Sequence, residues 1–366
     1  DGLASMDPYA AISGNFVLAG IKLAQGQLNT ALSIYEKALK LVLERNASMP
    51  LGTEELYSGI SELHRERGDL ETAAQDLLTG RKLGEQVELP DWQHRWYIAQ
   101  ARLHETKGDL DGALDLLEKA ERRYVRTPVP NMRPIAALKT RIRIAQGKIA
   151  EALDWVHTRD LSVDDDVSYL REFEHMILAR VLIAQEKKGL VDGSIHDAKA
   201  LLERLLQAAE EGRRMGSVIE ISALLALAHA AQGDIPLALA SLERALTLAE
   251  PEGYLRLFVD EGLPMAALLQ EAAKHGIAPN YVRQLLAAFG KDEGRTSVIQ
   301  LLIEPLSERE LEVLRLLGTE LTGPEIAREL MVSLNTMYTH TKSIYNKLGV
   351  NNRRMAIRRA EELDFL

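Results

Sequence analysis

The side chains with the clearest chemical use are basic residues near the carboxyl end. Between residues 330 and 360 the chain has six Lys and Arg and no Asp or Glu, although its formal net charge is −10. These residues are Lys342, Lys347, Arg353, Arg354, Arg358 and Arg359. A solvated helix face explains one such residue more simply. Six together indicate a surface that meets phosphates.

Helix-start signals show which elements position these cations. Ser307 with Glu310, and Thr322 with Glu325, each form a Ser/Thr-x-x-Glu capping box, and Ser333 is a third cap. The spacing predicts a helix after Ser307 and further helices over about 323–330, 334–348 and 353–363, the third ending at Gly349. Two helices joined by a short link, the second carrying positive charge, are typical of a helix-turn-helix.

The third helix is the candidate DNA-reading element. Met337, Ile344 and Leu348 are expected to face the core. The opposite side then projects three residues toward base edges in the major groove: Tyr338, Thr339 and Lys342. Six residues are candidates for phosphate contacts: Ser333, Thr336, His340, Lys347, Arg353 and Arg354.

Several separated blocks of this segment resemble the LuxR-type DNA-binding domain over about residues 303–366. The blocks are Pro305-Leu306-Ser307-Glu308-Arg309-Glu310-Leu311-Glu312-Val313-Leu314, Glu325-Ile326-Ala327, Thr336, His340, Ile344-Tyr345 and Lys347-Leu348-Gly349-Val350. The resemblance implies a four-helix domain that usually binds two half-sites as a dimer. The chain departs from the family at Met337-Tyr338, where Val-Lys is common, and at Glu320 and Gly323-Pro324, where Gly and Asn-Lys are common. The departure at Tyr338 bears on the strength and base preference of DNA binding, and the fold is unaffected.

A repeat of about forty residues fills most of the chain before this domain. Its turns share a basic or amide residue, Gly, a polar residue, Leu or Ile, and then Ala three residues later. The Ala residues step by 42, 40, 39, 46 and 40, and the fifth copy is stretched around Lys187-Lys188-Gly189. They are Ala31, Ala73, Ala113, Ala152, Ala198 and Ala238.

The chemistry of each turn predicts a helical hairpin. Gly ends one helix in the left-handed conformation, a following Asp caps the next helix, and the small Ala allows the two helices to approach closely. Each hairpin leaves an apolar face that the next one buries. Residues 10–250 are therefore interpreted as an α-solenoid of about six hairpins. The pattern resembles tetratricopeptide repeats, which run 34 residues, so longer helices are expected here.

The segment after the repeats predicts two short helices, over about 264–274 and 279–289, and a polar linker at 290–297. The expected fold is all-α: a tetratricopeptide-like superhelix over 1–250, short helices and linker over 251–302, and a LuxR-type domain over 303–366. This arrangement, with the stretch 250–265, is similar to the large ATP-binding LuxR regulators of the maltotriose-activator class. In that class an ATPase domain precedes the repeats. The chain shows no Walker A sequence, so we expect either a C-terminal piece of such a regulator or a shortened relative, and the missing initiator Met favours the piece.

Other chemistries find little support in the sequence. The absence of Cys excludes disulfides, Cys-ligated metals and a Cys nucleophile. No His-Glu-x-x-His, Gly-x-Ser-x-Gly or phosphate-loop pattern is present, so neither a catalytic site, a metal nor a cofactor is expected in this chain. The acidic run Asp164–Asp166 is more simply a helix start than a cation site. Trp92, Trp96, Trp155 and Tyr169 could line a ligand groove, but aromatics in helical repeats are more often core, so no ligand residue is assigned.

The function predicted from these patterns is a sequence-specific transcription regulator, not an enzyme. Its expected partners are double-stranded DNA, an inducer or protein partner on the repeats, and a second copy on DNA. No 18-residue apolar stretch occurs, so no membrane span is expected, and a cytoplasmic bacterial protein is predicted. The alternative is a protein-interaction scaffold whose helix-turn-helix serves dimerisation only. Tyr338 and the overall acidity favour that alternative weakly.

Overall fold

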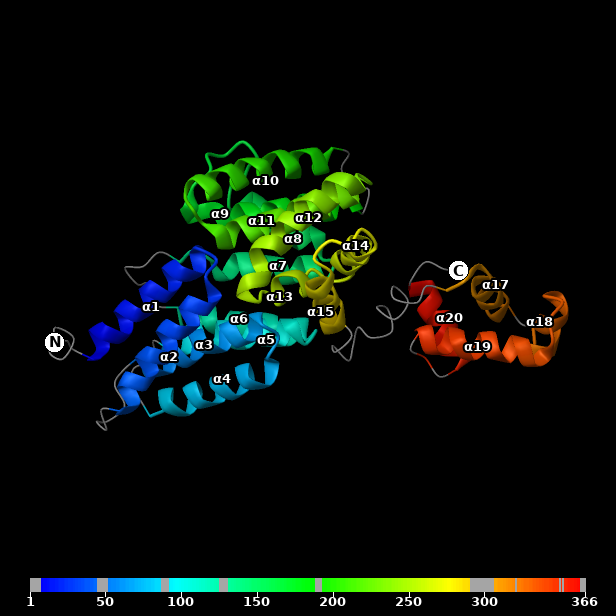
Figure 1. Cartoon of the computed structure of the whole chain (residues 1–366), viewed down its shortest axis with the longest axis horizontal. Helices are drawn as coiled ribbons and strands as arrows, with labels where there is room; N and C mark the ends of the chain where they lie inside the picture. Colours follow the sequence, from blue (N-terminus) through cyan, green and yellow to red (C-terminus); the bar gives the residue numbers. More distant parts are fainter. Residues whose placement is uncertain are drawn as a thin grey trace.

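The computed structural model describes residues 8–44, 52–86, 92–124, 131–187, 193–289, 306–319, 321–348, 350 and 352–362. Every regular element within these ranges is a helix (Figure 1). The predicted helix stop at Gly349, residues 188 and 189 of the stretched repeat copy and the predicted linker at 290–297 lie outside the described residues.

Six helical hairpins form the repeat region. They are α1 (Pro8–Ala24) with α2 (Leu28–Glu44), α3 (Thr53–Glu66) with α4 (Leu70–Gly84), α5 (Trp92–Thr106) with α6 (Leu110–Arg122), α7 (Ile135–Ala145) with α8 (Ile149–Thr158), α9 (Glu172–Lys187) with α10 (Ser194–Glu211), and α11 (Met215–Ala231) with α12 (Ile235–Ala249). The turn chemistry is as predicted. Gly68 and its counterparts in four other turns have positive φ, and Asp69, Asp109 and Asp234 each accept a backbone N–H at the start of the following helix.

The repeat Ala residues lie in the core of the hairpins. All six are completely buried, including Ala198 of the stretched copy. A larger side chain at these positions would push the two helices of a pair apart. The prediction of a helical solenoid is confirmed. Most of the helices are long, as expected from the long repeat, but α7 and α8 have only 11 and 10 residues.

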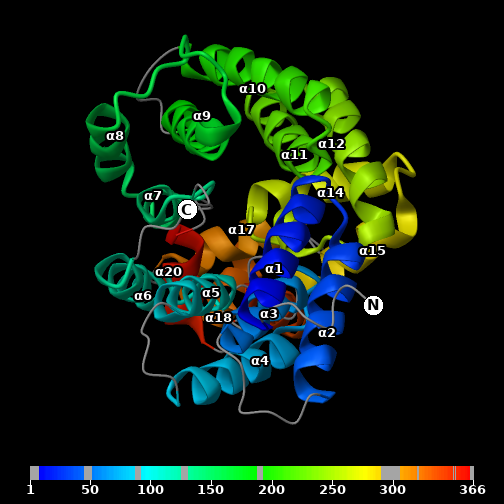
Figure 2. The ribbon, with the colours of Figure 1, turned by 90° about the vertical axis from the view of Figure 1, so that its left-hand side faces the viewer.

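The hairpins are arranged around a ring, with the first helix of each pair inside and the second outside (Figure 2). The inner helices pack on one another from hairpin to hairpin, α3 on α5 and α7 on α9 among them. An inner helix therefore has apolar neighbours on several sides, and α11 is buried almost all round. The ring brings its ends together, because α1 also packs on α11.

The first and last hairpins of the ring meet through backbone atoms at two glycines. Gly26, in the first turn, has φ of 77°, and a Cβ there would lie 3.1 Å from the backbone nitrogen of Gly216. A Cβ on Gly216 would lie 2.6 Å from the carbonyl oxygen of Leu23. In addition, Asn29 donates its backbone N–H to the Glu252 carboxylate at 2.8 Å. The two glycines thus allow the first hairpin to reach the last one.

After α12 the chain turns into the inner side of the ring. A short 3₁₀ helix (Glu250–Glu252) leads to α13 (Arg256–Val259), which packs on α3. Helices α14 (Leu263–Lys274) and α15 (Pro279–Phe289) then pack on each other, and α14 also packs on α11 and α12. Their bounds agree with the predicted short helices, but the segment before them is a packed part of the ring.

The described part of the C-terminal domain contains four helices: α17 (Glu308–Leu317), α18 (Gly323–Glu329), α19 (Leu334–Leu348) and α20 (Arg353–Glu362). Helices α17 and α20 both pack on α19. The core of this domain is separate from that of the repeats. It includes Met337, Ile344 and Leu348, as the spacing predicted.

Candidate nucleic-acid interface

The link between α18 and α19 fixes the direction in which α19 leaves the turn. Met331 has φ of 52°, an unusual conformation for a residue with a side chain. The Val332 N–H donates to the Ala327 carbonyl at 2.9 Å, and Ser333 Oγ accepts the Thr336 N–H at 3.0 Å. A helix end, a left-handed residue and a capped helix start form the helix-turn-helix geometry.

Glu310 ties the first helix of the domain to α19. Its carboxylate accepts the Ser307 N–H at 2.7 Å, which completes the predicted capping box. The same carboxylate accepts Ser343 Oγ at 2.6 Å and Lys347 Nζ at 2.8 Å. Burial raises the pKa of the Glu310 carboxyl, but the hydrogen bonds from Lys347, Ser343 and Ser307 outweigh it and lower the pKa to about 2. Glu310 therefore stays charged and holds the inner side of α19 in place.

The opposite side of α19 faces solvent. Tyr338, Thr339 and Lys342, the three residues predicted to meet base edges, are all exposed. Thr339 Oγ1 donates to the Asn335 carbonyl at 2.9 Å. Lys342 makes no hydrogen bond or ion pair with any part of the chain that the structure describes. The structure thus brings these three side chains to one helix face, as expected for an element that enters a groove.

Four of the predicted phosphate contacts are exposed or half-buried. Ser333 and Thr336 are exposed in the first turn of α19, and their hydroxyls lie 2.7 Å apart. His340 is half-buried on the same helix, and Arg354 is exposed at the start of α20. Hydroxyl groups at a helix start, followed by cations, suit the sugar-phosphate backbone beside a groove.

The other two predicted phosphate contacts are engaged inside the domain. Lys347 is ion-paired with the buried Glu310. The Arg353 guanidinium donates to the carbonyls of Leu317, Thr319 and Leu321 at 2.9, 2.6 and 2.6 Å, where α17 ends. Unpaired carbonyls at a helix end attract a cation. These contacts place Lys347 in the packing of α19 on α17 and Arg353 in the packing of α20 on the end of α17. We propose this structural role for both residues in place of the predicted phosphate contacts.

Sequence reasoning missed part of the exposed face. Asn335 is exposed and lies three and four residues before Tyr338 and Thr339, so it shares their side of the helix. An Asn amide can pair with adenine in the major groove. The same spacing that selected Tyr338 could have identified Asn335. The apolar side chains of Met331 and Leu334 are also exposed beside it.

The aromatic residues of the repeats are mainly structural. Trp92 and Trp155 are buried, and Trp96 packs against the core with its Nε1 donating to the Leu77 carbonyl at 2.8 Å. Tyr169 is partly exposed below the guanidinium of Arg214. The prediction that these aromatics belong to the core holds for the three Trp residues. In the acidic run, Asp165 pairs with Arg171 and His175, and the described residues contain no cluster of three metal-ligating side chains.

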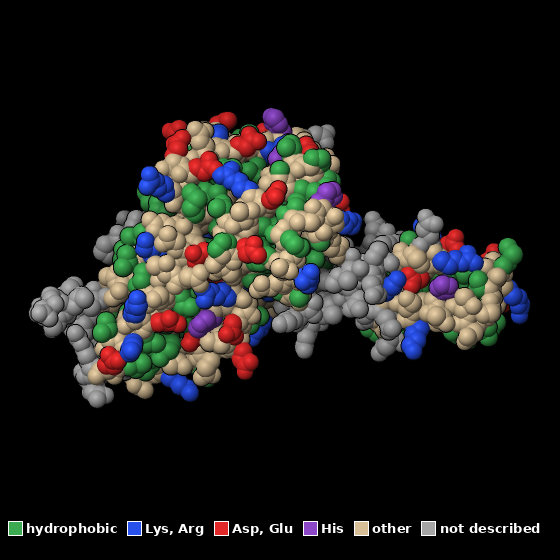
Figure 3. Space-filling model, viewed as in Figure 1, with side chains coloured by type: hydrophobic (Ala, Val, Ile, Leu, Met, Phe, Trp, Pro, Cys, Tyr) green, Lys and Arg blue, Asp and Glu red, His purple; other side chains and the backbone are tan. Residues whose placement is uncertain are grey.

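Acidic and basic side chains are mixed over the repeat surface, and basic side chains recur over the C-terminal domain (Figure 3). None of the described helices combines the length and the apolar character that crossing a bilayer requires.

Comparison with known families gives two matches. The family model of the MalT-like TPR region matches residues 5–275. The family model of bacterial regulatory proteins of the luxR family matches residues 304–360. The first match covers the six hairpins and α14, and the second covers the helix-turn-helix.

Proposed function

We propose that this chain, which belongs to the family with the MalT-like TPR region and ends in a DNA-binding domain of the luxR family, is a transcription regulator in which the repeats sense a ligand or partner and control assembly on DNA. The observation that supports the proposal best is the exposed face of α19, where Tyr338, Thr339 and Lys342 stand on a helix fixed from behind by Glu310.

In this proposal α19 lies in the major groove. Lys342 and Asn335 reach base edges, and Ser333, Thr336 and Arg354 contact phosphates on either side. One such domain covers a single half-site. When the repeats bring two chains together, the second contact becomes intramolecular, and affinity rises without any new contact. Control of association is then control of DNA occupancy.

The DNA-binding part is tested with the whole chain. A binding site is selected from random duplex DNA, and affinity is measured by fluorescence anisotropy at several KCl concentrations. The Lys342→Met variant is expected to lose about 1–3 kcal/mol on the selected site and to discriminate less between sites. Lys82→Met, which removes an exposed charge from α4, serves as the matched control. Equal binding of all three proteins to every duplex contradicts the assigned contacts.

The assembly part is tested by sedimentation of the chain with and without the selected duplex and candidate inducers. A single unchanged mass under all conditions contradicts control by association.

A second function, a protein-interaction scaffold, is favoured by one observation. Lys347 and Arg353, two of the six cations of the basic stretch, are engaged inside the domain. For a scaffold we expect no salt-dependent affinity for any duplex, with dimerisation through the C-terminal domain intact. The anisotropy experiment separates the two functions.

A further inference from the structure

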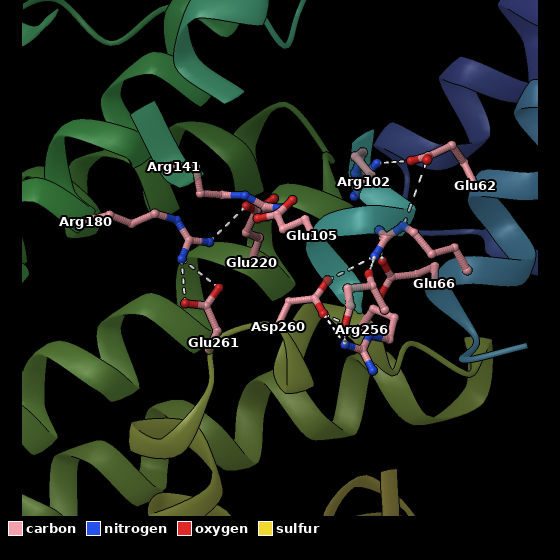
Figure 4. Close-up of polar contacts among 12 residues, drawn as sticks. Glu62, Glu66, Arg102, Glu105, Arg141, Arg180, Glu220, Arg256, Asp260 and Glu261 are labelled. Atoms are coloured by element: carbon pink, nitrogen blue, oxygen red, sulfur yellow. Dashed lines mark hydrogen bonds and ion pairs between the residues drawn. The ribbon is translucent and has the colours of Figure 1, made fainter. Parts of the chain in front are cut away.

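A row of arginines follows the inner side of the ring. Arg102, Arg141 and Arg180 stand 39 residues apart, one on each of the successive inner helices α5, α7 and α9. Because 39 residues match one repeat step, these side chains occupy corresponding positions in three neighbouring hairpins. Figure 4 shows them in one network of charged residues.

The carboxylates of the repeats do not fully occupy this row. Arg141 donates to Glu105 at 2.6 Å and Arg180 donates to Glu220 at 3.3 Å. Arg102 pairs with Glu62, which is shared with the buried Arg65. Within the described residues, the buried Nε donors of Arg102, Arg141 and Arg180 have no hydrogen-bond partner. A guanidinium offers five donors, so the row can serve more acceptor oxygens than the repeats supply.

A segment from beyond the repeats supplies two further carboxylates. We call residues 253–262 the acidic hook; it begins and ends at glycines with φ of 75° and 74°. Within the hook, Asp260 accepts Arg65 at 2.9 Å, and the adjacent Glu261 accepts Arg180 at 2.6 and 2.5 Å. Two consecutive carboxylates thus join the charged residues around Arg65 to those around Arg180 (Figure 4).

The formal charges of the network also indicate that the hook completes it. The described network contains one more cation than carboxylate from the repeats, and the hook, with two carboxylates and one arginine, brings the total to neutral. The repeat residues are Arg65, Arg102, Arg133, Arg141, Arg180, Glu62, Glu66, Glu105 and Glu220, and the hook residues are Arg256, Asp260 and Glu261. Burial and the nearby charge of Arg65 lower the pKa of Arg102 to about 10. For Arg141 and Arg180, burial is outweighed by nearby carboxylates, which raise the pKa.

We propose that the inner face of the ring binds a small oxyanion, a carboxylate or phosphate ester, at Arg102, Arg141 and Arg180, in competition with the carboxylate of Glu261. The proposal rests on the proposed sensing function and gives the ligand its chemical class. Planar, multi-donor guanidinium groups recognise carboxylate and phosphate oxygens better than any other side chain. The hook shows the chemistry that this surface accepts, because its own carboxylates already occupy part of it.

The position of the hook connects this site to the rest of the chain. The Leu255 N–H donates to the Glu66 carbonyl at 3.0 Å, and the Leu257 N–H donates to the Glu66 carboxylate at 2.7 Å. The hook leads directly into α14 and α15, the last described helices before the C-terminal domain. A ligand that displaces Glu261 therefore loosens the segment that joins the sensor to the DNA-binding domain.

Calorimetric titration of the whole chain at constant ionic strength tests the site. Citrate and inorganic phosphate are the two probes, and they distinguish a carboxylate from a phosphate ligand; KCl is the blank. We expect saturable binding of at least one probe, with one site per chain. Arg102→Gln is expected to weaken that binding at least about tenfold, the effect of losing a charge-assisted contact. Glu62 keeps Arg65 as a neighbour in this variant, so the fold is expected to persist.

Glu261→Gln tests the competition. Without its charge the hook holds Arg180 less strongly, so the same probe is expected to bind several-fold more tightly, while Glu243→Gln, an exposed carboxylate on α12, leaves affinity unchanged. If neither probe gives saturable heat, or if Arg102→Gln binds like the wild type, the site is wrong. An unchanged affinity in Glu261→Gln contradicts the competition. Because DNA binding is measured separately by anisotropy, failure of this site leaves the test of DNA recognition intact.

Discussion

Replacement of Lys347 by Met separates structural support from DNA contact in the basic segment. Lys347 Nζ lies 2.8 Å from a Glu310 carboxylate that is only 6% exposed. The substitution keeps most of the aliphatic side chain and removes the charge, which leaves Glu310 with its hydroxyl and backbone donors from Ser343 and Ser307. A buried carboxylate that loses one charged partner costs about 1–3 kcal/mol. A fully uncompensated ion would cost more. We therefore expect the C-terminal domain to lose about 2 kcal/mol of unfolding free energy.

The measurement has to report on the C-terminal domain by itself. The three Trp residues all lie in the repeats, so tryptophan emission does not report on this domain. Hydrogen exchange followed by mass spectrometry gives the opening free energy of α19 peptides in the whole chain. Tryptophan emission during urea unfolding is expected to be unchanged and serves as an internal control. DNA affinity is measured against KCl concentration under conditions where the variant remains folded.

The salt dependence decides between the two roles. A residue that contacts a phosphate contributes about 0.9 to the slope of log affinity against log salt concentration. For Lys347→Met we expect faster exchange in α19 and an unchanged slope. For Lys342→Met we expect unchanged exchange and weaker binding. If Lys347→Met exchanges like the wild type and its salt slope falls by about one, Lys347 is a phosphate contact and the structural role that we propose for it is refuted.

Three further results are expected. The pKa of the Glu310 carboxyl is about 2 in the folded domain, compared with an ordinary value of 4.5. The stabilisation of the domain by ionised Glu310 is therefore fully present above about pH 5 and is lost as the pH falls toward 2. In Glu310→Gln, the opening free energy of α19 measured by hydrogen exchange should depend less on pH over this range. Arg353→Gln removes the donor to three carbonyls and should lower the stability of the domain by about 2 kcal/mol in the same assay, whereas the exposed Arg354→Gln should weaken DNA binding without that change. Ala152→Leu places a larger side chain at a completely buried position and should destabilise the repeats by about 1–3 kcal/mol in tryptophan-monitored urea unfolding. The exposed Ala150→Leu should not destabilise them. Equal urea midpoints for the two variants would contradict the close packing of α7 and α8.

Local and periodic features were predictable from the sequence. Glycine turns, Asp and Ser caps and apolar spacing act within a few residues, so helix bounds such as Leu334–Leu348 could be predicted at once. The exposed face of α19 followed from the same periodicity. The roles of Lys347 and Arg353 could not be predicted, because a cation near a helix end looks alike in sequence whether it meets a phosphate or a buried carboxylate 37 residues away.

The inner face of the ring shows why such contacts escape sequence reasoning and why they matter. Arg65 and Asp260 are 195 residues apart, and no local rule relates them. Buried ion pairs of this kind add little net stability, because desolvation offsets much of their attraction. Once the ring has formed, however, removing one partner of a buried pair leaves the other charge buried without compensation. The free-energy cost of this is far larger than that of breaking an exposed pair. We therefore propose that the hook is released only by a group that replaces its carboxylates, a requirement that an oxyanion of similar chemistry meets and a neutral ligand does not.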